Sequence, residues 1–240
     1  MTPRPLIMLP HAGGTSTVFD PLCAALPSGV LPVPLELPGR GRRWRETAAT
    51  TVDEAADDLA DQVTAAFPGE VAVFGHSLGA YLGVALAARL ADGGTTRCTT
   101  LFASANAAPS SAELPSEVPP LLTTDDEIFA IAERSGGAVP PQIREHPQLR
   151  GRAADLLRAD FAIGDSFLRK RRETVTAADL VVICGTEDVF AGTPLDDWRH
   201  SSRAGTEVIR LPGGHFYLEQ PEQAAALADL IAARLLPHAP

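Results

Sequence analysis

The residues best suited to chemistry lie in the pentapeptide Gly75-His76-Ser77-Leu78-Gly79. It follows the apolar run 71–74 and precedes a segment rich in small apolar residues, so Ser77 falls where a strand is expected to become a helix. Glycine two residues on either side of the serine permits this sharp turn, because a side chain there would collide with neighbouring elements. The helix N-terminus also favours negative charge that develops beside the serine. The pattern predicts Ser77 as a nucleophile, and the plainer alternative is a glycine-rich turn with an N-capping serine.

A serine hydroxyl is a poor nucleophile at neutral pH, so it needs a general base and an acidic residue that orients the base. His215 follows a glycine pair directly after the last apolar run, where flexible backbone can carry an imidazole over the serine. Glu187 and Asp188 follow the apolar run 180–184, and both are candidates for the acid. We prefer Asp188 and leave Glu187 open. Ser77, Asp188 and His215 would then form a catalytic triad.

Attack of the serine on a carbonyl produces an oxyanion, which two backbone N–H groups can stabilise. One donor is expected from Leu78, the residue after the nucleophile. The other is expected from the loop after the first strand, Pro10-His11-Ala12-Gly13-Gly14-Thr15, whose glycines let the backbone approach a ligand closely. We take Ala12 as this second donor. An ordinary strand-to-helix turn would need the same glycines, so their presence alone does not establish the role.

The elements that must position these residues form an alternating pattern. Six short, nearly continuous apolar runs are bounded by turn residues, as expected for parallel strands covered on both faces. Segments with apolar residues at helical spacing lie between them, and the alternation predicts an α/β fold with a mostly parallel, doubly wound sheet. The expected strands are 6–9, 33–37, 71–74, 99–103, 180–184 and 207–211, and the expected helices include 51–67, 77–91 and 221–236.

One stretch interrupts this alternation. Residues 107–176 contain no convincing strand, begin with a segment rich in proline and serine, and continue with helical patterns at 125–134 and 147–167. Because long unstructured loops are uncommon in compact domains, we expect a helical lid insertion over the carboxyl ends of the strands. The chain 1–240 is otherwise expected to form a single domain, since α/β folds often exceed about 200 residues.

Composition and charge exclude several classes of function. The chain of 240 residues has a net charge of −10, whereas a nucleic-acid-binding protein needs a positive face. No apolar stretch approaches the roughly 20 residues of a membrane span. The N-terminus does not match a signal peptide, so we expect a cytoplasmic protein. The three cysteines lack the paired spacing of disulfides or zinc sites, and we expect neither a metal nor another cofactor.

Five motifs spread along the chain carry a family resemblance. They are Leu9-Pro10-His11-Ala12-Gly13-Gly14, Leu37-Pro38-Gly39-Arg40, Gly75-His76-Ser77-Leu78-Gly79-Ala80, Leu157-Arg158-Ala159-Asp160-Phe161 and Gly213-Gly214-His215-Phe216-Tyr217-Leu218. Together they resemble the stand-alone, or type II, thioesterases of polyketide synthase and nonribosomal peptide synthetase pathways, which have the α/β-hydrolase fold. The chain departs from the usual family pattern at Leu78, where methionine is commoner, and at Val189, where proline is common.

The resemblance implies that Ser77, Asp188 and His215 form the triad, that Ala12 and Leu78 are the oxyanion donors, and that the lid covers an acyl chamber. It also implies an editing activity, the hydrolysis of unwanted acyl groups from the phosphopantetheine thiol of an acyl or peptidyl carrier protein. The residues alone support acyl transfer through an acyl-enzyme. They leave open a general carboxylesterase acting on free esters, and transfer or cyclisation of a carrier-bound substrate.

Two arginine-rich runs could contact such a partner. Carrier domains are commonly acidic and this chain is acidic too, so docking would require a local positive rim. We hypothesise that Arg42, Arg43 and residues 169–172 contribute to it, although solvated surface charge explains any single one equally well. Arg40 belongs to the family motif and is expected to be structural.

Overall fold

Six parallel strands form the centre of the computed structural model, which describes residues 2–92, 94–113, 118–170 and 174–236. The strands pair in the order β2-β1-β3-β4-β5-β6, and each pair of neighbours is parallel. Their bounds are β1 (Arg4–Leu9), β2 (Val30–Pro34), β3 (Gly69–His76), β4 (Thr96–Ser104), β5 (Asp179–Gly185) and β6 (Thr206–Leu211). The predicted α/β class with a parallel sheet is confirmed.

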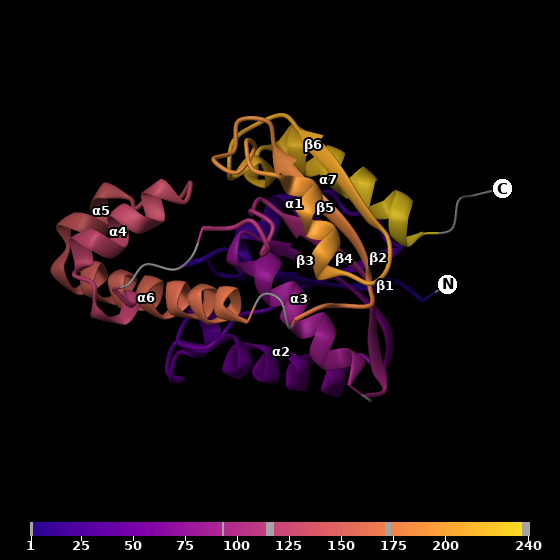
Figure 1. The fold of residues 1–240 in the computed structure, drawn as a ribbon, viewed down its shortest axis with the longest axis horizontal. Coiled ribbons are helices and arrows are strands. Elements are labelled where there is room, and N and C mark those ends of the chain that lie inside the picture. The colour runs from indigo at the N-terminus through magenta and orange to yellow at the C-terminus, as the bar shows by residue number, and fades with distance from the viewer. Residues whose placement is uncertain (1, 93, 114–117, 171–173, 237–240) are drawn as a thin grey trace.

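Helices cover both faces of this sheet (Figure 1). They are α1 (Asp20–Ala25), α2 (Val52–Ala66), α3 (Leu78–Ala91) and α7 (Pro221–Leu235), with short 3₁₀ helices η1 (Ser16–Phe19), η2 (Gly41–Arg43), η4 (Leu195–Ser201) and η5 (Tyr217–Glu219). Successive side chains of a strand point to opposite faces, so the core divides into two layers. Ile7 and Val73 pack with α2 and α3, whereas their neighbours Met8 and Phe74 pack with α1 and α7. The sheet is therefore doubly wound.

Strand β2 differs from its expected range, whereas the other five expected strands lie within the observed ones. Pairing with β1 begins at Val30, three residues before the predicted start. Because β2 is an edge strand, Pro32 and Pro34 are accommodated without removing a hydrogen bond from the sheet interior. The Leu35 N–H still donates to the Met8 carbonyl at 3.0 Å, so contact with β1 continues one residue past the strand.

Helix α2 shows how local sequence sets an element's limits. It begins after Thr51, whose side chain accepts from the Glu54 N–H, while the Glu54 carboxylate accepts from the Thr51 N–H. These reciprocal bonds form a capping box, which satisfies two N–H groups that the helix cannot pair internally. Val52, Leu59 and Val63 are buried at helical spacing in the core layer that α2 shares with α3. The apolar stripe predicted within 51–67 is thus the buried face.

The segment 107–176 is built differently from the rest of the chain. Its described residues contain helices and a single bridge residue, Thr176, but no strand. The helices are η3 (Pro120–Leu122), α4 (Asp125–Arg134), α5 (Pro141–Glu145) and α6 (Pro147–Arg169). Figure 1 shows α4 and α5 standing out at one end of the molecule, while α6 runs back beside α3. An apolar cluster that includes Phe129 and Leu157 joins α4 to α6.

The described residues contain no helix that is both long and apolar enough to cross a membrane. They also contain no group of three or more His, Cys, Asp or Glu side chains able to hold a metal ion. Cys98 and Cys184 are buried, Cys23 is partly buried, and none of the three forms a disulfide. Cys98 and Cys184 pack among the apolar side chains of the core.

Candidate active site

Ser77 lies on a strained turn between β3 and α3. Its φ of 54° and ψ of −116° fall outside the regions that L-residues normally occupy. A β-carbon on Gly75 would lie 1.9 Å from the Gly79 carbonyl oxygen, and one on Gly79 would lie 2.0 Å from the Leu9 carbonyl oxygen. The Ser77 N–H donates to the Ser104 carbonyl at 2.8 Å. The turn therefore requires both glycines, and it places Ser77 at the carboxyl end of β3.

The elbow glycines allow a prediction about stability. We expect Gly79→Ala to lower the free energy of unfolding by about 3 kcal/mol, because the added carbon meets backbone atoms that cannot rotate away. In a chain of this length that corresponds to a fall in Tm of about 6–12 °C, measured by circular dichroism. Gly151→Ala in α6 is the control, since nothing lies within 4 Å of its added carbon. Equal melting temperatures for the two variants would contradict the packing argument.

His215 and Asp188 form a buried pair at neighbouring strand ends. Asp188 lies in the loop after β5, and His215 lies in the loop after β6. His215 Nδ1 is 3.2 and 3.1 Å from the two carboxylate oxygens of Asp188, and the side chains are 4% and 0% exposed. The Phe190 N–H also donates to Asp188, at 3.0 Å. Because a carboxylate can only accept, Nδ1 carries the proton and Nε2 is left as an acceptor.

Glu187 is adjacent in sequence but differently placed. Its side chain is exposed, and its backbone N–H donates to the Gly213 carbonyl at 2.9 Å. Within the described part of the chain, the hydrogen bonds of the His215 ring to carboxylates go to Asp188 alone. The structure thus places Asp188 and not Glu187 against His215, and the role of Asp188 as the orienting acid stays a prediction.

Ser77 and His215 both lie at the carboxyl edge of the sheet, after β3 and β6. The ring of His76, the residue before Ser77, lies with its centroid 5.3 Å from that of His215. No hydrogen bond joins the Ser77 hydroxyl to His215 among the described residues. Such bonds in catalytic sites often tighten only when substrate binds. The fold thus gathers all three predicted residues at the carboxyl edge of the sheet and joins two of them directly.

Two further imidazoles surround His215. Burial, with the neighbouring histidines as a second cause, lowers the pKa of His76 well below its usual value. Burial also lowers the pKa of His11. His76 Nδ1 lies 2.8 Å from the Ser104 hydroxyl, which in turn lies 2.7 Å from the Tyr217 hydroxyl. His76 and His11 are therefore neutral at pH 7, and His76 packs beneath the turn.

The two expected oxyanion donors lie on adjoining segments. Leu78 is the first residue of α3, where an N–H has no partner within the helix. Ala12 lies in the loop after β1, and the close approach of Gly79 to the Leu9 carbonyl shows that this loop adjoins the start of α3. Among the described residues, neither the Ala12 nor the Leu78 N–H donates to another protein group. Such uncommitted donors are what an oxyanion site requires.

Two contacts at the site escaped the sequence reasoning. Asn106 Nδ2 donates to the Ser77 carbonyl at 2.9 Å and so supports the strained turn. Asn106 follows β4 by two residues and so lies at the same edge of the sheet as Ser77, which is the feature of the sequence that could have predicted this contact. Gly136, in the loop after α4, has a φ of 88°, and a β-carbon there would lie 2.6 Å from His215 Cγ. Part of the segment 107–176 therefore packs directly on His215.

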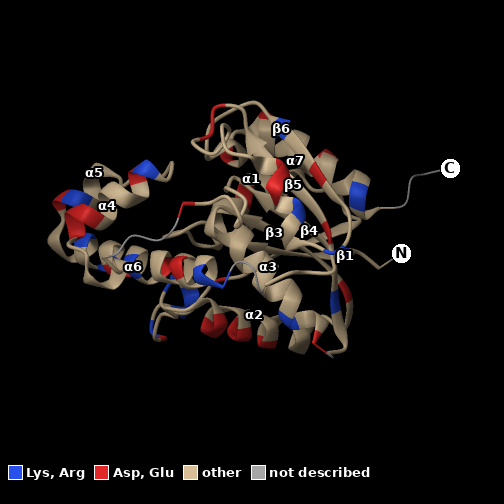
Figure 2. Ribbon diagram, viewed as in Figure 1, with Lys and Arg blue, Asp and Glu red and all other residues tan. Residues whose placement is uncertain are grey.

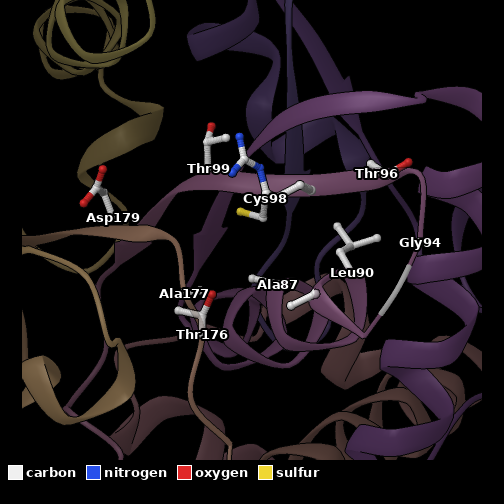
Figure 3. A pocket seen from close by; sticks show the side chains of 11 residues that line it. Ala87, Leu90, Gly94, Thr96, Cys98, Thr99, Thr176, Ala177 and Asp179 are labelled. Atoms are coloured by element: carbon white, nitrogen blue, oxygen red, sulfur yellow. The ribbon is translucent and has the colours of Figure 1, made fainter.

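A pocket of about 410 Å³ lies elsewhere, between α3 and the amino ends of β4 and β5 (Figure 3). Leu90, Cys98, Thr99 and Asp179 are among the residues that line it. Because all the strands are parallel, their amino ends lie at the edge of the sheet opposite Ser77. This pocket is therefore separate from the candidate active site.

Known proteins of similar sequence and structure point to one family. The family model described as the thioesterase domain matches residues 4–235. The AMB antimetabolite synthetase AmbE of Pseudomonas aeruginosa is 30% identical over 98% of this chain, which spans only 11% of that protein. The medium-chain S-acyl fatty acid synthase thioesterase of Rattus norvegicus is 28% identical, with 95% of this chain and 86% of that protein covered.

A solved structure agrees with the sequence matches. The type II thioesterase BorB from the borrelidin biosynthetic cluster superposes with a TM-score of 0.79 and 29% identity, covering 98% of this chain and 93% of that one. The match therefore includes both the sheet and the helical segment 107–176. Because the family model also spans almost the whole chain, this protein belongs to the thioesterase domain family.

Proposed function

We propose that this protein hydrolyses acyl thioesters on the phosphopantetheine thiol of carrier proteins, and so removes stalled acyl groups from a polyketide synthase or nonribosomal peptide synthetase. The observation that carries the proposal is the buried His215–Asp188 pair beside the strained turn at Ser77. This arrangement is able to activate a serine for attack on an acyl group. The similarity to a type II thioesterase from a biosynthetic cluster supports the choice of substrate.

The proposed reaction proceeds in two halves. His215 Nε2 takes the proton of Ser77 as its oxygen attacks the thioester carbon, and the Ala12 and Leu78 N–H groups stabilise the oxyanion. The carbon–sulfur bond then breaks, and His215 returns the proton to the departing thiol. In the second half His215 takes a proton from water as the water attacks the acyl-enzyme. The ester bond to Ser77 then breaks, His215 returns the proton to the Ser77 oxygen, and a carboxylic acid is released. Asp188 stabilises the imidazolium form of His215 in both halves.

We further propose that the segment 107–176 acts as a lid over the acyl chain. The loop at Gly136 packs on His215, and Leu157 of α6 lies beside Gly13 in the loop that carries Ala12. The segment thus contacts both the proposed base and the proposed oxyanion loop. A cover in this position would exclude water from the site until it is needed for the second half of the reaction.

The experiment that tests this function compares two acyl donors with the same acyl chain. One is a thioester loaded on a carrier domain, and the other is a free ester of similar size. We expect acid release from the carrier-bound thioester to have the higher kcat/KM. Better turnover of the free ester would identify a general carboxylesterase. A product in which the acyl group is cyclised or transferred to another molecule would show that the enzyme catalyses acyl transfer and not hydrolysis.

The carrier protein would dock on what we call the basic rim, formed by Arg42, Arg45, Arg152 and Trp44. The side chain of Arg42 is 83% exposed, although its Nε lies 3.7 Å from the buried Glu36 carboxylate. The guanidinium groups of Arg45 and Arg152 lie 4.7 and 5.5 Å from the centre of the exposed Trp44 ring. Positive charge is thus gathered in η2, just after it and on α6, although the chain carries −10 overall and α2 is acidic (Figure 2). An acidic carrier domain would find complementary charge here.

The other arginines of the docking hypothesis are placed differently. Arg43 donates to Asp58 and Glu46, and these hydrogen bonds raise its pKa. Lys170 pairs with Asp53 at 2.5 Å. Arg169 is exposed at the end of α6, whereas residues 171 and 172 lie outside the described residues. Because Arg42 is 83% exposed with one contact at 3.7 Å, whereas Arg43 is 22% exposed with two close carboxylate partners, we retain Arg42 for the rim and assign Arg43 a structural role.

Charge reversal of the rim tests the docking proposal. We expect the double variant Arg42→Glu, Arg45→Glu to raise KM for a carrier-bound thioester about tenfold, because repulsion replaces attraction to the acidic carrier. The effect should shrink as salt is added. Turnover of a small acyl-N-acetylcysteamine thioester, which needs no docking, should not change.

The matched control is Arg97→Glu, Arg203→Glu, which makes the same change in net charge at exposed arginines near the amino ends of β4 and β6. It should leave KM for the carrier-bound substrate unchanged. If both double variants raise KM equally, the effect comes from net charge and the basic rim is not the docking surface.

A further inference from the structure

A buried ion pair joins helix α6 to the loop that carries Ala12. Arg40 donates from Nη1 to Asp160 Oδ2 at 2.8 Å and from Nη2 to Oδ1 at 2.5 Å, and the two side chains are 2% and 0% exposed. This is the two-pronged geometry that gives strong, directional arginine–carboxylate bonds. Asp160 Oδ2 also accepts from the Gly13 N–H at 2.6 Å, and Arg40 Nη1 reaches the Gly14 carbonyl at 3.4 Å. The pair therefore holds the loop on both sides.

The peptide unit between Ala12 and Gly13 is anchored at both ends. Its N–H is the group that donates to Asp160, and its carbonyl accepts from His11 Nδ1 at 2.8 Å. A carbonyl can only accept, so His11 carries its proton on Nδ1. Because a peptide unit is planar, two anchors on opposite edges fix its rotation. The Ala12 N–H belongs to the preceding peptide unit, which is joined to the anchored plane through the Ala12 α-carbon, so its direction depends on that plane.

Helix α6 also touches the second proposed donor. Leu157, Asp160 and Gly164 lie at spacings of three and four residues, which places them on one face of the helix. A β-carbon on Gly13 would lie 3.0 Å from Leu157 Cδ2, and one on Gly164 would lie 3.6 Å from Leu78 Cδ1. One helix face therefore packs against both segments that supply the oxyanion donors.

The energetics favour a geometric role for the ion pair. Removing two charges from water is expensive, so a buried pair of this kind adds little to stability compared with apolar side chains of similar volume. What apolar side chains could not supply is an acceptor for the Gly13 N–H or a donor for the Gly14 carbonyl. The pair thus provides directional bonds at the one loop where the direction of a backbone N–H matters to the reaction.

We propose that Asp160, held by Arg40, is a positioning residue that orients the Ala12 N–H toward the oxyanion, so that α6 sets the geometry of the oxyanion site. This inference rests on the proposed serine mechanism. It assigns to a helix of the lid segment a role in transition-state stabilisation that is separate from covering the substrate. Asp160 itself touches neither the substrate nor the reacting atoms.

The test measures binding of two substrate analogues alongside turnover of an acyl-N-acetylcysteamine thioester. An acyl trifluoromethyl ketone forms a tetrahedral adduct with Ser77 and so needs the oxyanion donors, whereas a thioether of the same length has no carbonyl to attack. Asp160→Ala should lower kcat/KM about 100-fold and weaken binding of the ketone by a similar factor. Binding of the thioether should change by less than about twofold, because its affinity comes from burial of the chain.

Two variants keep the test decisive. Asp160→Asn retains an acceptor for the Gly13 N–H but lacks the charge that holds Arg40, so we expect a smaller loss of about tenfold in both kcat/KM and ketone affinity. It serves in place of Asp160→Ala if that variant does not fold. The control is Asp155→Ala, on the same helix, where the carboxylate is 80% exposed in its ion pair. It should change neither the binding of the two analogues nor the turnover.

The possible results separate the inference from the mechanism on which it rests. Equal weakening of the ketone and the thioether would mean that Asp160 only supports the fold of the site, and unchanged ketone affinity despite lost turnover would place its effect elsewhere. Either result overturns the inference. Ketone binding by Ser77→Ala as tight as by the wild type would instead overturn the serine mechanism itself.

Discussion

Replacing Ser77 with alanine should lower acid release from a carrier-bound thioester by about a millionfold. Without the hydroxyl no acyl-enzyme can form, and His215 has no serine proton to accept, so both halves of the proposed reaction are lost. The fold should remain intact, because Ser77 holds its turn through backbone bonds to Ser104 and Asn106. The measurement is single-turnover acid release with unchanged circular dichroism as the check on folding.

A double variant makes the same prediction sharper. His215→Ala should lower the rate of acid release about as much as Ser77→Ala does. The two changes together should lower it no further than either alone, because the residues act as one unit. Ser110→Ala, at an exposed serine after β4, is the control and should have no effect. Losses that multiply in the double variant would mean that the two residues contribute independently, against the triad.

The sequence allowed the candidate site to be predicted where local pattern and topology act together. The elbow is local, since Gly75 and Gly79 are required by backbone contacts within the turn and its immediate neighbour β1. Asp188 and His215 are distant in sequence from Ser77, but each follows a strand of one parallel sheet. The carboxyl ends of parallel strands meet at one edge, so loops after β3, β5 and β6 necessarily gather there.

The contacts of the helical segment could not be predicted in this way. Arg40 and Asp160 are 120 residues apart, and their contact depends on how α6 packs across the loop after β1. Helical periodicity predicts that Asp160 lies on a helix, but not that it is buried opposite an arginine. The short helix α5 was missed because its five residues, Pro141–Glu145, are too few to show a periodic pattern.

The choice between two adjacent acids is the remaining question at the triad, and substitution by amides should settle it. Asp188→Asn should lower kcat about ten-thousandfold, whereas Glu187→Gln should change it by less than about twofold. An asparagine amide can donate to His215 Nδ1, which would hold the ring in the tautomer that cannot accept the serine proton at Nε2. The exposed Glu187 side chain makes no such contact in the described structure.

The pattern of kinetic constants matters as much as the size of the loss. Because Asp188 acts on the reacting histidine and not on the acyl chain, its loss should appear in kcat with little change in KM. Asp188→Asn and Glu187→Gln are matched variants, since each converts one carboxylate to an amide at neighbouring positions of the same loop. A larger loss for Glu187→Gln than for Asp188→Asn would transfer the acid role to Glu187 and require the loop after β5 to rearrange when substrate binds.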